Sequence, residues 1–136
     1  MLVSPILSIF IFLLFKGLLD GNGTNTRFNQ PQGCTAFGDK IAIADYGNDA
    51  IRTVDIELMT VESLIKHGSQ SSPDGVYTGS STTGGGVDKP IFIESLNRTH
   101  LIILCEPATV RMINTDQEVV STLISDSWSQ VSIHKI

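Results

Sequence analysis

The chain has 136 residues, of which 41% are hydrophobic and 17% charged, and its formal net charge is −5. This length allows one domain with a real core, and the composition excludes a disordered chain. The nine basic residues are scattered along the sequence, so the positive patch that nucleic-acid binding requires is missing, and we expect no nucleic-acid partner.

The first segment, residues 1–15, is almost wholly apolar and ends at Lys16. It is similar to the apolar core of a signal peptide, although no basic residue precedes it and no clear cleavage site follows. The run is shorter than the roughly 20 apolar residues of a membrane span. We expect residues 1–19 to form an apolar helix that acts as a signal peptide or membrane anchor; a strand of a truncated repeat is the alternative. The acceptor triplets at Asn22 and Asn97 predict a glycoprotein that is secreted or membrane-anchored on the extracellular side.

An internal repeat organises the rest of the chain. Pro31 and Pro90 are 59 positions apart, as are Arg52 and Arg111. Each unit contains short runs rich in β-branched residues, separated by turn-forming residues. With a fourth strand from a flanking segment, the pattern predicts an all-β fold: a partial β-propeller of about two four-stranded antiparallel blades.

The predicted division of the chain follows from the repeat. Residues 67–88 are rich in Gly, Ser and Thr, which is typical of a long exposed loop. The glycine run within this segment lacks the Lys-Ser or Lys-Thr of a phosphate-binding loop. The expected parts are a signal or anchor at 1–19, a blade at 20–66, the loop at 67–88, a degenerate blade at 89–125, and a tail or the start of a further blade at 126–136.

Residues 20–65 resemble an NHL repeat: a Gly-rich loop, Phe-x-x-Pro-x-Gly, an apolar strand ending in Ala-Asp, then Gly-Asn and Ile-Arg. The second unit keeps the proline and the arginine but lacks the Ala-Asp-x-Gly-Asn turn. The resemblance implies a part of a propeller, completed by further blades or by self-assembly. The positions that match the motif are Pro31, Gly33, Asp45, Gly47, Asn48 and Arg52 in the first unit, and Pro90 and Arg111 in the second.

We expect these motif residues to have structural roles. The prolines can begin strands, where a missing amide hydrogen does no harm, and Gly33 indicates a close approach of two backbones. Asp45 and Asn48 suit hydrogen bonds to turn groups, and Gly47 between them suits a positive φ. Arg52 is expected to bond a turn carboxylate or carbonyl, and Asp45 is its candidate partner.

The sequence contains no catalytic motif that we recognise and predicts no cofactor. The histidines His67, His100 and His134 lack metal-ligand spacing. The cysteines, Cys34 and Cys105, lie in apolar stretches and are expected to be buried thiols; a bridge between them is the alternative. Calcium is the one metal considered, because four aspartates could bind it in a propeller channel, as in lactonase-like relatives of this architecture; these are Asp20, Asp39, Asp45 and Asp49.

The sequence therefore favours a non-enzymatic binding or scaffold module for a protein or glycan partner, with loops presented on a rigid β scaffold. The alternative is a fragment of a calcium-dependent hydrolase or lyase propeller whose catalytic residues lie in other blades. A degenerate product without a stable fold is a third interpretation.

Overall fold

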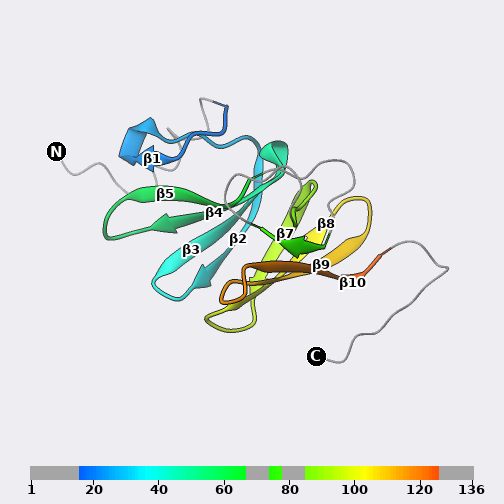
Figure 1. The fold of residues 1–136 in the computed structure, drawn as a ribbon. Helices are drawn as coiled ribbons and strands as arrows, with labels where there is room; N and C mark the ends of the chain where they lie inside the picture. Colours follow the sequence, from blue (N-terminus) through cyan, green and yellow to red (C-terminus); the bar gives the residue numbers. More distant parts are fainter. Residues whose placement is uncertain (1–15, 67–73, 78–84, 126–136) are drawn as a thin grey trace.

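The computed structural model describes residues 16–66, 74–77 and 85–125. In this part of the chain two five-stranded antiparallel sheets account for nearly all regular structure, so the all-β prediction is confirmed (Figure 1). The first sheet contains β1 (Gly21–Asn22), β2 (Pro31–Phe37), β3 (Lys40–Asp45), β4 (Ala50–Asp55) and β5 (Thr60–Ile65). The second contains β6 (Gly75–Val76), β7 (Pro90–Ser95), β8 (His100–Cys105), β9 (Thr109–Asn114) and β10 (Val119–Ile124). Two short 3-10 helices, η1 (Gly23–Asn25) and η2 (Tyr46–Asn48), lie beside the first sheet.

The two sheets are equivalent strand for strand. Their orders are β1-β5-β4-β3-β2 and β6-β10-β9-β8-β7. Arg52 pairs across the first sheet with Ile43 and Ser63, and Arg111 occupies the same place in the second sheet. Both edge strands, β2 and β7, begin with a proline that is followed by a register irregularity. The repeat predicted from the sequence is therefore present as two sheets with the same order and nearly the same register.

The expected count of four strands per sheet is wrong, because the two-residue strands β1 and β6 add a fifth strand to each sheet. They pair with β5 and β10, respectively. Strand β6 lies inside the segment 67–88 that was expected to be an exposed loop, and Tyr77 and Val87 in that segment are buried. Isolated apolar residues inside a Gly- and Ser-rich stretch can reach the core, and composition alone does not reveal this.

The predicted N-terminal helix falls mostly on residues 1–15, outside the described residues. Its last four residues, 16–19, are described and are not helical, because Lys16 forms an isolated bridge with Phe28 and Leu19 forms one with Arg27. Across the three described ranges, no helix has the length and apolar character that crossing a membrane requires.

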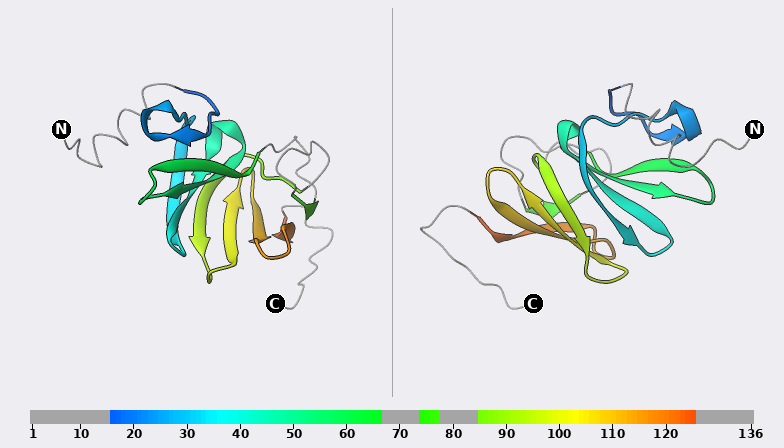
Figure 2. Two further views of the ribbon diagram at one scale, coloured as in Figure 1. Left: turned by 60° about the vertical axis from the view of Figure 1, so that its left-hand side comes forward. Right: turned by 180° about the vertical axis from the view of Figure 1, so that it is seen from behind.

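The two sheets meet at their equivalent edge strands. Strand β7 packs against β2 and β3, and the sheets diverge from there toward β5 and β10 (Figure 2). A Cβ atom on Gly33 would lie 3.3 Å from the Cα of Phe92, so this glycine allows the close approach that the sequence predicts. One buried cluster fills the space between the sheets; it includes Ala42, Ala44, Ile51, Ile93, Leu101, Ile103 and Ile113.

Candidate functional site

A buried arginine fastens the first sheet to the segment that precedes it. The Arg52 side chain is fully buried, and its Nη1 lies 3.0 Å from Asp45 Oδ2, as predicted. Its Nη2 lies 2.8 Å from Asp20 Oδ1, and the guanidinium also donates to the carbonyl oxygens of Leu19 and Arg27. The Phe28 ring lies 4.8 Å from the Arg52 Cζ. The guanidinium therefore holds residues 19–28 against the sheet.

The second sheet repeats part of this arrangement. Arg111 Nη2 lies 3.3 Å from Asp74 Oδ1, and Thr122 Oγ1 donates to the same oxygen at 2.7 Å. In the first sheet, Ser63 Oγ donates to Asp20 Oδ1 at 2.8 Å. Each sheet thus contains an aspartate, an arginine and a hydroxyl at equivalent strand positions.

Sequence reasoning missed Asp74. The available signal was an Asp-Gly pair, which occurs at Asp20-Gly21 and again at Asp74-Gly75. These pairs are 54 positions apart, so they do not fit the spacing of 59 that relates the other motif residues. The chain from Asp74 to Pro90, which begins β7, is five residues longer than the chain from Asp20 to Pro31, which begins β2, and this length difference concealed the match.

The turn between β3 and β4 is held by the motif residues. Asp45 Oδ1 accepts from the Asn29 amide at 2.8 Å, and Asn48 Nδ2 donates to Asp45 Oδ2 at 2.7 Å. The expected positive φ at Gly47 is wrong, because Asp49 has the positive φ, 49°. Gly47 is needed for space instead: a Cβ there would lie 2.6 Å from the Asn29 side chain.

The remaining motif positions fall at equivalent places. Pro31 and Pro90 begin β2 and β7, as predicted. Cys105 ends β8 where Asp45 ends β3; it is buried, and burial raises the pKa of its thiol to about 11. Both cysteines are free, but Cys34 is exposed. Its expected burial is wrong because alternate side chains of the edge strand β2 point outward.

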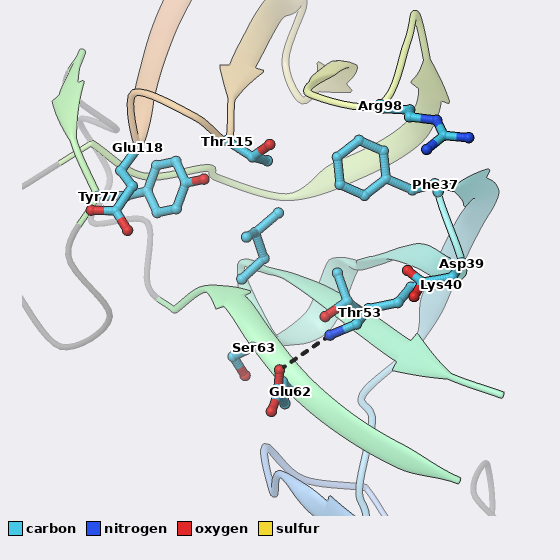
Figure 3. A pocket seen from close by; sticks show the side chains of 12 residues that line it. Phe37, Asp39, Lys40, Thr53, Glu62, Ser63, Tyr77, Arg98, Thr115 and Glu118 are labelled. Carbon is cyan, nitrogen blue, oxygen red and sulfur yellow. Dashed lines mark ion pairs between the residues drawn. The ribbon is translucent and has the colours of Figure 1, made fainter. Parts of the chain in front are cut away.

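A cleft of about 810 Å³ lies between the sheets where they diverge. Figure 3 shows Phe37 and Tyr77 at opposite sides of it, with Lys40 and Glu62 on the wall formed by the first sheet. Arg98, from the turn between β7 and β8, completes one rim. The hairpin turns of both sheets thus bring aromatic and charged groups to one opening.

Charges of both signs line this cleft. Lys40 Nζ lies 3.6 Å from Glu62 Oε2 in an exposed pair. Burial, together with the nearby Glu118 carboxylate, raises the pKa of Tyr77 to about 12, so its hydroxyl keeps its proton at neutral pH. The cleft therefore offers a ligand aromatic surface, a hydroxyl donor and charged groups.

The four aspartates considered for calcium do not form one group. Asp20 and Asp45 both bond Arg52, Asp39 lies at the cleft, and Asp49 accepts from the Lys89 amide. Within ranges 16–66, 74–77 and 85–125, no three His, Cys, Asp or Glu side chains form a group suited to a metal ion. His67 and His134 lie outside these ranges.

The two glycosylation acceptors are exposed. Asn22 lies in β1. Asn97 lies in the turn between β7 and β8, where its Oδ1 accepts from the amides of Thr99 at 2.8 Å and His100 at 2.9 Å. Both side chains can be reached from solvent. The side-chain amide oxygen of Asn97 also stabilises the turn in which this residue lies.

Comparison with known proteins does not identify a family. Neither the protein-family models nor the curated proteins contain a match to this chain.

Proposed function

We propose that this chain is part of an NHL-like β-propeller and acts as a non-enzymatic scaffold that binds a protein or glycan partner outside the cell. One observation carries the proposal: two sheets of the same strand order pack through equivalent edge strands and open a cleft between them. Blades that repeat in sequence and meet at their inner strands are the plan of a propeller. A secreted or membrane-anchored location rests on residues 1–19 and the acceptor triplets.

The cleft is the proposed ligand site. Its volume falls within the roughly 300–1,000 Å³ typical of ligand pockets, and it lies at the hairpin turns of a rigid β scaffold, where recognition residues commonly sit. Aromatic side chains there supply contact area, and charged groups at the rim supply orientation. A peptide segment or a short oligosaccharide fits this combination.

The test uses the full chain, a glycan array and a phage-displayed random peptide library. We expect at least one glycan or peptide class to bind, and the substitutions Arg98→Glu and Glu118→Lys at the cleft rim to weaken that binding about tenfold or more. Asp116→Lys is the matched control, because Asp116 is exposed in the same turn as Glu118 but does not line the cleft. Binding that the rim variants leave unchanged, or that the control weakens equally, would contradict the proposal.

The alternative, a fragment of a calcium-dependent hydrolase or lyase, has no observation in its favour among the described residues, because Asp20 and Asp45 are paired with Arg52 and no group of three candidate ligands forms there. Calcium binding to the native state would raise the unfolding temperature. A clear rise in the unfolding temperature of the full chain on adding calcium chloride would support this alternative.

A further inference from the structure

The two sheets pack on each other through opposite faces. In the first sheet, the face that carries Ala42, Ala44 and Ile51 is buried against the second sheet. In the second sheet, the buried face carries Ile103 and Ile113. The position equivalent to Ala44 in the second sheet is Leu104, which lies on the other, half-exposed face. The packing is therefore head to tail.

The open face of the first sheet matches the face that the second sheet already uses. Cys34 and Ala36 are exposed on it, and their equivalents, Ile93 and Ser95, lie on the face of the second sheet that packs against the first. The same holds for the half-buried residues beside them in β3 and β4. The open-face set is Cys34, Ala36, Ile41, Ile43 and Val54; its equivalents in the packed face are Ile93, Ser95, Leu101, Ile103 and Ile113.

The open face of the second sheet matches the packed face of the first. Phe92 is 50% exposed, and its equivalent is Gly33, which contacts β7. Neighbouring apolar side chains in β8 and β9 are half-buried. This set is Phe92, Ile102, Leu104, Val110 and Met112; its equivalents are Gly33, Ala42, Ala44, Ile51 and Thr53.

The open faces are apolar and correspond, position for position, to the two faces that the chain already packs together. Within the chain, small residues on the first sheet (Gly33, Ala42 and Ala44) face large ones on the second. On the open face of the first sheet the small residues, Cys34 and Ala36, lie on the edge strand β2, and Ile41 and Ile43 beside them in β3 are of the same size class as their equivalents Leu101 and Ile103. The two open faces therefore offer the same kind of apolar surface, in the same arrangement, that the chain already uses once.

We propose that the open face of the second sheet binds the open face of the first sheet of another copy of this chain. The contact is heterologous, because each copy contributes its first-sheet face to one neighbour and its second-sheet face to another. Such an assembly closes into a ring or continues as a filament, depending on the rotation that relates one copy to the next. Burial of the two apolar faces drives association. The faces lie on the outer sides of the two sheets, away from the cleft, so this association and ligand binding are separate properties.

The test measures the mass of the full chain by light scattering over a concentration series. We expect the wild-type chain to form a species of at least two copies. Ala36→Glu blocks the first face, and Phe92→Lys blocks the second; each variant alone should be monomeric. Mixed in equal amounts, the two variants should form a dimer and nothing larger, since one intact face of each kind remains. Leu104→Lys, on the second face, or Cys34→Glu, on the first, repeats the comparison should either variant fail to show a cooperative unfolding transition.

The control is Leu58→Lys in the turn between β4 and β5, where Leu58 is 70% exposed and outside both faces; it should assemble as the wild type does. Alkylation of Cys34 gives a second readout, because the thiol should react several-fold more slowly in wild-type assemblies than in the Phe92→Lys monomer. A wild-type chain that stays monomeric overturns the proposal, as does assembly that survives both single-face variants. A monomer in which Cys34 is protected also overturns it, because a segment of the same chain then covers that face.

Discussion

The buried arginines allow a matched test of what holds each sheet. Replacing Arg52 with methionine keeps an apolar stem but removes every hydrogen bond of the guanidinium. The Asp45 carboxylate, which is fully buried, then loses its cation. Removing one partner of a buried ion pair costs about 3–5 kcal/mol in the free energy of unfolding, because the other charge stays buried without compensation.

Arg111→Met is the matched comparison, and we expect it to cost less than Arg52→Met, because no buried carboxylate is left without its cation. Its ion-pair partner, Asp74, has a side chain that is 53% exposed and can return to water. Burial disfavours the charged form of Arg111 and lowers its pKa. Methionine carries no charge, so the substitution also removes this unfavourable contribution to the free energy of folding.

Urea unfolding followed by far-UV circular dichroism measures both costs. With a slope of about 2 kcal/mol per molar urea, Arg52→Met should lower the midpoint by roughly 1.5–2.5 M. Adding Asp45→Leu to Arg52→Met should restore part of the loss, because the uncompensated charge is gone. Equal costs for the two arginine variants, or no recovery in the double variant, would refute the assignment of the buried pair.

Three further outcomes follow from the structure. Gly33→Val should lower the free energy of unfolding by about 1–3 kcal/mol, measured by urea unfolding, because its side chain would meet the backbone of β7 between the sheets. Burial, together with a neighbouring carboxylate, raises the pKa of Asp88 above 3.8, so the ionised form destabilises the native state; Asp88→Asn should therefore raise the unfolding temperature at pH 7, and the gain should vanish below pH 3.8. In the native Phe92→Lys monomer, Cys34 should react with iodoacetamide, whereas Cys105, with a pKa of about 11, should react only on unfolding, as peptide mapping by mass spectrometry can check.

The strands could be predicted because their signals are local. Runs such as Ile41-Ala42-Ile43 alternate and are rich in β-branched residues, and a turn-forming stretch separates them from the next run. The pairing of Arg52 with Asp45 was also within reach, because two facing strands joined by a short turn bring them together. The role of Gly47 was missed, because a clash with Asn29 depends on how a distant segment crosses the turn.

The all-β class, the two units and the strand that each proline begins could be predicted from the amino-acid sequence, because neighbouring residues encode alternation, turns and spacing. Three features became visible only in the folded chain: Asp74 repeats the role of Asp20, each sheet gains a fifth strand, and particular faces of the sheets are packed or open. These features depend on segments that are far apart in the chain, and the lengths of the intervening loops are not constrained by the repeat. Where a side chain packs against a distant partner, local pattern carries no information about that partner.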